Sequence, residues 1–179
     1  MAVIGIDVGA TGAIGVVNLM GYCSVTTAPH YINAKKTKRK NKETGLMGSA
    51  TINEKKLDEV GFIELMGSLL ATYGVNTPVF MEKVGVMPSQ GLVSMASFIG
   101  TYQFQRGVVK ALGFTVHDVT PMKWKRHFKI QDSALTTSKK KALAMDLARK
   151  YFPDAPLPLA KDHDKAEALL IAQYGFEVL

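Results

Sequence analysis

The chain has 179 residues, of which 47% are hydrophobic, and its formal net charge is +7. This length favours a single domain spanning 1–179, and the apolar fraction excludes an intrinsically disordered chain. Six of the positive charges lie within residues 35–42, so the rest of the chain carries only +1. A basic segment on a nearly neutral body suits either contact with a phosphate backbone or a solvated loop without a partner.

Cysteine content and hydropathy limit the cellular setting. Cys23 is the single cysteine, so no disulfide can form within the chain and a reducing compartment is expected. The N-terminus enters an apolar strand within two residues and lacks the basic lead of a signal peptide. No apolar run approaches the length of a membrane span. These features predict a cytoplasmic protein with no membrane partner.

Short apolar runs bounded by turn residues predict five strands: 2–7, 13–19, 22–27, 78–82 and 114–119. The first three follow one another through tight turns, which predicts a three-stranded antiparallel meander. The last two are reached through helices and are expected to be parallel strands. Apolar residues at helical spacing predict helices at about 53–73, 92–112, 121–128, 138–151 and 164–176. The expected fold is therefore α/β, with a mixed five-stranded sheet flanked by helices.

One segment, at about 29–53, has no apolar periodicity and contains the basic run. The residues of that run are Lys35, Lys36, Lys38, Arg39, Lys40 and Lys42. A stretch of this length without structure is unusual inside a domain and is often functional. We therefore expect an excursion from the body, either a mobile arm or a long hairpin.

Four acidic residues lie where a buried charge would need compensation. Asp7 ends the first apolar run, Glu82 ends the fourth, and Asp164 and Glu167 open the last helix three residues apart, on one helix face. If the first and fourth strands are parallel neighbours, Asp7 and Glu82 lie about 5 Å apart at the same end of the sheet. Converging carboxylates suit Mg²⁺ or Mn²⁺ and suit zinc poorly.

Each acid also has a purely structural interpretation. Asp7 precedes a turn, and Glu82 could end its strand at the surface. Asp164 and Glu167 could form a capping box, and Asp162 is expected to be an N-cap or a surface acid. The four acids together, in the order that the topology demands, favour a metal site.

Four motifs carry a resemblance to a known family. They are Gly5-Ile6-Asp7-Val8-Gly9 followed by Thr11-Gly12-Ala13, then Phe80-Met81-Glu82-Lys83, Pro121-Met122-Lys123-Trp124-Lys125, and Asp162-His163-Asp164-Lys165-Ala166-Glu167-Ala168-Leu169-Leu170-Ile171-Ala172. With them the chain resembles the RuvC-type Holliday junction resolvases of the RNase H-like superfamily, and especially their short bacteriophage-type members. Glu167 departs from the Asp common at that position, and the lysine-rich insertion departs from the compact cellular pattern.

The resemblance implies a metal-dependent, structure-selective endonuclease that cuts Holliday junctions and other branched DNA by paired symmetric nicks. It implies that Asp7, Glu82, Asp164 and Glu167 are catalytic and hold two Mg²⁺ ions, for which Mn²⁺ can substitute. One ion would activate a water and the other would stabilise the leaving 3′ oxygen, giving a 5′-phosphate and a 3′-hydroxyl. A homodimer is also implied, since a two-fold protein matches a two-fold junction. A bacteriophage origin would place the protein in the host cytoplasm.

Basic residues outside the run are expected to share its role. Lys83, Lys123 and Lys125 are, with the run, the expected DNA-binding residues. Asp162, His163 and Lys165 adjoin the acids and are candidate accessory residues.

Two apolar features have open interpretations. Trp124 could stack on a base, although packing of its short helix is the stronger expectation. The helix from Leu92 is the candidate dimer face, but its apolar residues could equally be core: Met95, Phe98, Ile99 and Tyr102.

Other functions share part of this pattern. Residues 7–12 also resemble the first phosphate loop of actin-like kinases and ATPases, but those proteins need two such domains, so no nucleotide cofactor is expected. An RNase H-like nuclease acting on structured RNA would share the site chemistry. A non-catalytic DNA-binding relative would not need all four acids.

Overall fold

The computed structural model of the chain describes residues 1–40, 45–85, 91–131 and 134–179. Its strands are β1 (Ala2–Asp7), β2 (Ala13–Asn18), β3 (Cys23–Thr27), β4 (His30–Lys40), β5 (Met47–Leu57), β6 (Pro78–Glu82) and β7 (Thr115–Val119). Its helices are α1 (Glu59–Tyr73), α2 (Leu92–Ala111), α3 (Pro121–His127), α4 (Thr137–Tyr151) and α5 (His163–Val178), with a 3₁₀ turn η1 (Ala160–Asp162) before α5.

Five of the strands form one mixed sheet in the order β3-β2-β1-β6-β7. β1, β2 and β3 pair antiparallel, as a meander does, whereas β6 pairs parallel with both β1 and β7. The expected meander and the two expected parallel strands are therefore confirmed. The parallel pairing of β1 with β6 brings the C-terminal ends of these two strands together at one edge of the sheet.

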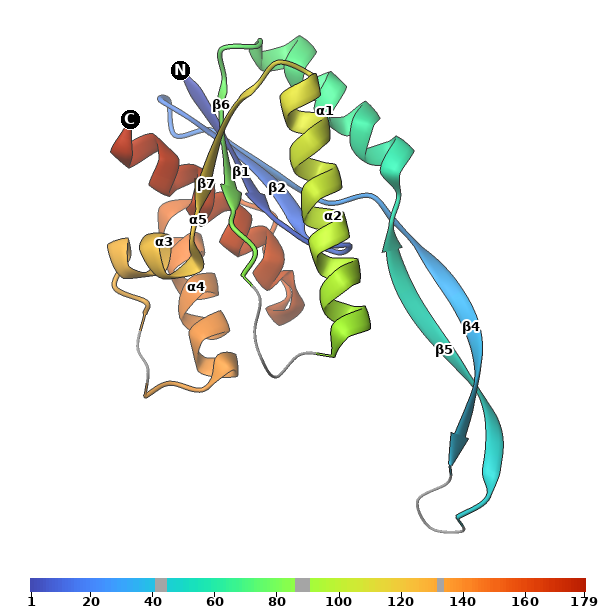
Figure 1. The fold of residues 1–179 in the computed structure, drawn as a ribbon. Coiled ribbons are helices and arrows are strands. Elements are labelled where there is room, and N and C mark those ends of the chain that lie inside the picture. The colour runs from blue at the N-terminus through green and yellow to red at the C-terminus, as the bar shows by residue number, and fades with distance from the viewer. Residues whose placement is uncertain (41–44, 86–90, 132–133) are drawn as a thin grey trace.

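Side-chain alternation along β1 separates the two faces of the sheet. Ile4 and Ile6 are fully buried in the core that α1 and α2 share with the sheet. Val3 is buried in the other core, which is shared with α3, α4 and α5, and Gly5 and Asp7 point to the same side by alternation. Figure 1 shows α1 and α2 on one side of the sheet and α3, α4 and α5 on the other. Asp7 thus points toward the face that α5 covers.

Helix α5 approaches β1 and β2 unusually closely. A Cβ placed on Gly5 would lie 2.3 Å from both the carbonyl oxygen of Ala168 and the amide nitrogen of Ala172. A Cβ on Gly15 of β2 would lie 2.9 Å from the carbonyl carbon of Ala168. Glycine on the strands and alanine on the helix permit this approach. It fixes the position of Glu167, the residue before Ala168, over the end of β1.

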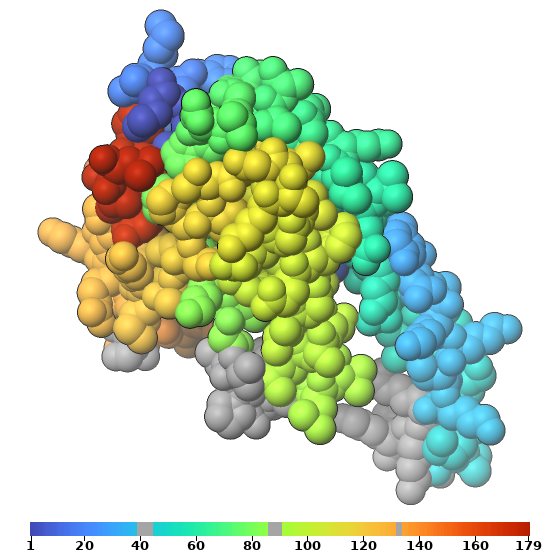
Figure 2. All heavy atoms as spheres, turned by 45° about the horizontal axis from the view of Figure 1, so that its top comes forward, coloured from blue at the N-terminus to red at the C-terminus, as the bar shows by residue number. Residues whose placement is uncertain are grey.

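The segment between β3 and α1 is a long hairpin. β4 and β5 have eleven residues each and pair antiparallel from His30 with Leu57 to Lys40 with Met47. Figures 1 and 2 show this two-stranded ribbon standing away from the body. The hairpin alternative for this excursion is therefore the one that the structure adopts.

The helix expected to start at Asn53 is wrong at its beginning. Asn53 pairs with Ala34 in the hairpin, and the strand continues to Leu57. The helix begins only after Asp58, whose side chain accepts a hydrogen bond from the backbone N–H of Gly61 at 3.1 Å. Strand pairing overrides the helix propensity of the Glu-Lys-Lys stretch, and the N-cap sets the true start. No helix in the described part of the chain is both long and apolar enough to cross a membrane.

Candidate active site

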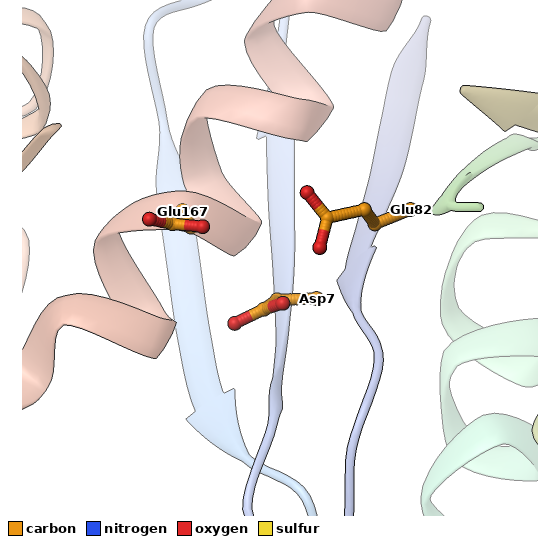
Figure 3. A group of neighbouring side chains, drawn as sticks. All are labelled: Asp7, Glu82 and Glu167. Atoms are coloured by element: carbon orange, nitrogen blue, oxygen red, sulfur yellow. The ribbon is translucent and has the colours of Figure 1, made fainter. Parts of the chain in front are cut away.

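Three acidic side chains from separate elements converge where β1 and β6 end. Asp7 ends β1, Glu82 ends β6, and Glu167 lies in the second turn of α5. One carboxylate oxygen of each lies within 4.8 Å of the corresponding oxygen of the other two. Figure 3 shows the three carboxylates directed toward a common space between the strands and the helix. The predicted convergence of these three acids is therefore present.

Burial makes these charges costly. Asp7 and Glu167 are only 9% and 8% exposed. Burial raises the pKa of the Asp7 carboxyl well above its usual range, and the charges of Glu82 and Glu167 raise it further. Burial likewise raises the pKa of Glu82, although a hydrogen bond from Trp124 acts in the opposite direction. A cation in this space would offset both the burial and the mutual repulsion that raise these pKa values.

Helix α3 contributes two residues that hold the acids. The indole Nε1–H of Trp124 donates to Glu82 Oε1 at 3.0 Å, and the Trp124 side chain is fully buried. The ammonium of Lys125 donates to both carboxylate oxygens of Glu167, at 3.2 and 3.1 Å. The packing interpretation of Trp124 is thus correct and its stacking on a base is wrong, because the ring has no exposed face.

Asp164 lies at the rim of the site, outside the cluster of three. It lines the same cavity as Asp7, but its Oδ1 lies 3.0 Å from Nε2 of His163, which also contacts the Lys141 ammonium. Asp164 and Glu167 do not form the capping box that was their structural alternative. The N-cap position of α5 is occupied by Asp162, without a side-chain cap.

Two of the candidate accessory residues turn away from the cluster. Asp162 Oδ2 accepts the backbone N–H of Leu159 at 2.9 Å, and its Oδ1 lies 3.4 Å from the Lys165 ammonium. The hydrogen bond from Leu159, together with Lys165, lowers the pKa of Asp162. Neither Asp162 nor Lys165 lines the cavity of the three acids. Their contacts stabilise the turn that leads into α5.

The acids line an open cavity of about 470 Å³, and other residues that line it were not identified as site residues from the sequence. Thr137, Lys140 and Lys141 from the first turns of α4 line it, as does the turn after β1. A run of lysines at the start of a helix was their only sequence signal. Gln105 of α2 was also missed: it is fully buried, and its side-chain amide lies 3.4 Å from the Gly9 carbonyl, in that same turn.

The expected DNA-binding residues fall into three groups. Lys35, Lys36 and Lys38 are exposed on β4, as are Lys83 and Lys123 on the body. Lys125 is instead half-buried and engaged with Glu167. Arg39 and Lys40 belong to β4 by their backbone, and Lys42 lies outside the described residues.

The candidate dimer helix is partly core. Tyr102 is buried, and its hydroxyl donates to Asp118 Oδ1 at 2.8 Å, so this residue belongs to the interior. Phe98 is 36% exposed and lines the acidic cavity. Leu92 and Val93, at the start of α2, are 79% and 85% exposed. The most exposed apolar residues of this helix are therefore in its first turn.

The donor set fits a hard divalent cation. All the donors in the cluster of three are carboxylate oxygens, which Mg²⁺ and Mn²⁺ favour, and no His or Cys belongs to this cluster. The raised pKa of Asp7 shows that the single ammonium of Lys125 leaves the cluster under-compensated. The residues present therefore suit such an ion.

No protein-family profile and no curated protein matches the sequence. Solved structures do match the fold. Thermus thermophilus RuvC in complex with a Holliday junction substrate superposes with a TM-score of 0.55 at 18% identity, covering 97% of this chain and 91% of that chain. A second structure of Thermus thermophilus RuvC gives a TM-score of 0.50 at 15% identity, with 99% and 96% covered.

The fowlpox virus Holliday junction resolvase also matches, with a TM-score of 0.48 at 13% identity over 99% of this chain and 98% of that chain. The RuvC superpositions span nearly the whole of both chains. The chain therefore has an RNase H-like α/β fold, of the kind found in RuvC.

Proposed function

We propose that this protein is a metal-dependent endonuclease that cuts Holliday junctions and other branched DNA. The observation that carries the proposal is the buried cluster of Asp7, Glu82 and Glu167 at the end of the parallel strands, in an open cavity. The burial and mutual repulsion of three acids here cost stability, and a purely structural role does not account for that cost. A nuclease needs them as ligands for metal ions.

The proposed ligands are the three clustered acids, with Asp164 at the rim of the cavity as a fourth. Two Mg²⁺ ions, or Mn²⁺ in their place, would supply an activated water and stabilise charge on the leaving oxygen. The longer Glu167 side chain, where the family commonly has Asp, reaches the cluster while paired with Lys125. The resulting products would carry a 5′-phosphate and a 3′-hydroxyl.

Residues of this chain would orient the substrate and the ligands. Trp124 restrains the Glu82 carboxylate through its indole N–H. Lys140 and Lys141 line the cavity beside the acids and provide positive charge for the phosphate of the cut strand. His163 Nε2 lies between Lys141 and Asp164, and so it links the basic wall of the cavity to the acidic one.

The fold supports the proposed substrate and is compatible with the proposed assembly. A RuvC of the same fold is seen with a Holliday junction substrate. A homodimer would place two such sites on the two strands of a four-way junction and so make paired symmetric nicks. The exposed lysines Lys83 and Lys123, together with those of the ribbon, would contact DNA phosphates.

The proposal is tested by a panel of labelled substrates. A four-way junction, a matched linear duplex and a structured RNA are incubated with the protein in Mg²⁺ or in EDTA. We expect cleavage of the junction in Mg²⁺ alone, with ends that a ligase can rejoin. Cleavage of the RNA in preference to the junction would favour the RNA-processing alternative. Junction cleavage in EDTA would reject the metal-dependent site.

A further inference from the structure

The β4–β5 ribbon has the length of a DNA-binding element. Eleven residues at about 3.3 Å each make a ribbon of roughly 35 Å, close to one helical turn of duplex DNA. In Figure 1 it extends toward the same side as the C-terminal end of β6, where the acids lie. The ribbon therefore points in the same direction as the edge of the sheet that carries the clustered acids.

The two faces of the ribbon differ in charge. Residues paired across the strands share a face, and successive residues alternate between faces. The face that we call the groove face comprises these residues whose side chains the structure describes: His30, Ile32, Ala34, Lys36, Lys38, Met47, Ser49, Thr51, Asn53, Lys55 and Leu57. This face has no acid among its described residues. The opposite face carries Glu54, the single acid of the two strands, which pairs with Lys56 at 2.9 Å.

The groove face continues into a basic groove beside the active site. A depression of about 540 Å³ at the base of the ribbon is lined by His30 and Lys55 of this face. Its other wall comes from α4, η1 and α5 and includes Lys141, Lys161 and Lys165. Four lysines and two acids line it in all.

The groove and the active-site cavity are continuous. Thr11, Lys141 and Asp164 line both of them. A polyanion that enters the cavity therefore has a positively charged path toward the ribbon. Without metal the clustered acids repel phosphates, so the cations along this path would contribute to substrate affinity.

We propose that the groove and the groove face of the ribbon hold one duplex arm of the substrate by its phosphates, beyond the cleaved bond. This rests on the proposed function as a nuclease of branched DNA. The described residues of the groove face include no Phe, Tyr or Trp, so the stacking platform of single-strand binding proteins is missing there. A twisted ribbon carries one face along a helical path, as a duplex requires.

Two neighbouring lysines provide a matched test. Lys36 lies on the groove face and Lys35 on the opposite face, and both are exposed. Binding to labelled junctions is measured in EDTA over a series of salt concentrations, with arms of about 20 or about 8 base pairs, the latter shorter than one helical turn. Lys36→Ser is expected to weaken long-arm binding severalfold and to reduce the log–log salt slope by about 0.9. Lys35→Ser is expected to lower both quantities by clearly less, because Lys35 lies on the face that points away from the groove.

The dependence of binding on arm length distinguishes contact along the ribbon from a general effect of positive charge. With short arms, Lys36→Ser is expected to bind as the wild type does, because the duplex ends before the ribbon. The proposal would be overturned if Lys35→Ser and Lys36→Ser lost equal affinity. It would also be overturned if Lys36→Ser lost the same affinity for short arms as for long arms. Cleavage by the wild type in Mg²⁺ is followed in parallel. If junctions are cut but Lys36→Ser binds normally, the ribbon inference fails alone; if nothing is cut, the proposed function fails.

Discussion

At Asp7, burial opposes the charged form of the carboxyl that its proposed role as a metal ligand requires. The residue is 9% exposed, and its carboxyl lies near those of Glu82 and Glu167 without a direct cationic partner among the described contacts. Burial and the two neighbouring charges raise its pKa, so the charged form opposes folding. Protonation or metal binding removes this cost, so the free energy of unfolding depends directly on the protonation and metal occupancy of the site.

Asp7→Asn is expected to make the metal-free protein more stable at neutral pH. Because the folded pKa of Asp7 exceeds the unfolded one, the native state binds more protons between the two values. The stability that protonated Asp7 contributes to the wild type is therefore present at low pH and is lost as the pH rises through its raised pKa. Each tenfold difference in acidity between the folded and unfolded states corresponds to about 1.4 kcal/mol of that loss.

Urea unfolding in EDTA across a pH series measures this effect as the difference between wild type and variant. The difference removes the opposite trend of acids with lowered pKa, such as Asp118 and Asp162. Mg²⁺ is expected to stabilise the wild type more than the variant. If the free energy of unfolding depends on pH in the same way for both proteins, the surroundings of Asp7 do not raise its pKa.

Lys125→Met should destabilise the metal-free protein and tighten Mg²⁺ binding. The Lys125 ammonium neutralises Glu167 from a position with 20% side-chain exposure. Removing it leaves a buried acid unpaired, at a cost of about 2–4 kcal/mol. It also removes a cation that competes with the metal, so we expect Mg²⁺ affinity to rise about tenfold, or ~1.4 kcal/mol.

Thermal melts in EDTA and calorimetric titration with Mg²⁺ test both signs. Lys123→Met is the matched control, since Lys123 lies on the same helix, two residues earlier, and is exposed. An unchanged melting temperature for Lys125→Met would show that the ion pair contributes nothing. Weaker Mg²⁺ binding would show that Lys125 supports the metal site instead of competing with it.

At the scale of elements, the site depends on how closely α5 lies on β1. Gly5→Ala would place a methyl group 2.3 Å from two backbone atoms of α5, so the helix has to move. We expect a loss of about 2–3 kcal/mol in the free energy of unfolding, measured by urea denaturation, and weaker Mg²⁺ binding as Glu167 shifts. Gly67→Ala in α1 is the control. It meets nothing within 4 Å and should stabilise the helix by about 0.5–1 kcal/mol. A Gly5→Ala protein as stable as the wild type would contradict this packing.

Elements that depend on local pattern were predictable from the sequence. The apolar runs ending in Asp7 and Glu82 indicated buried strands with an acid at the same end. The parallel pairing of β1 with β6 confirms that the two strands are neighbours. The position of Glu167 on the last helix was likewise readable. Helix α1 was misplaced at its start because the strand that precedes it is held by pairing with a distant segment.

Contacts between distant segments were not predictable. Lys125 and Glu167 are 42 residues apart, and so are Trp124 and Glu82, so no spacing rule connects them. The site lysines of α4 look like an ordinary solvated helix start in the sequence. Asp164 was grouped with Glu167 because they share a helix face, but its contact with His163 leaves it at the rim.

At the scale of the whole molecule, each chain is expected to hold one complete site. Asp7, Glu82 and Glu167 meet within one chain. If the protein is a two-fold dimer, a mixed dimer of wild type and Asp7→Asn should therefore nick one strand of a junction without resolving it. Co-expression of two differently tagged chains, with purification through both tags, provides the mixed dimer for gel analysis.

The alternative results for the mixed dimer have different meanings. Resolved linear product at the wild-type rate would mean that one site cuts both strands. Absence of nicking would mean that the site is shared between subunits, contrary to its geometry within one chain. A monomer at micromolar concentration in light scattering would contradict the dimer itself.

The most direct test of the acidic site is the cleavage rate of a labelled four-way junction in Mg²⁺ by wild type, Asp7→Asn and Glu82→Gln. The wild type is expected to cut the junction and to spare a linear duplex in the same reaction. Both variants should be slower by roughly a hundredfold or more, because each loses a metal ligand, while their melting temperatures without metal hold or rise. Cutting at the wild-type rate by either folded variant would contradict the assignment of these carboxylates.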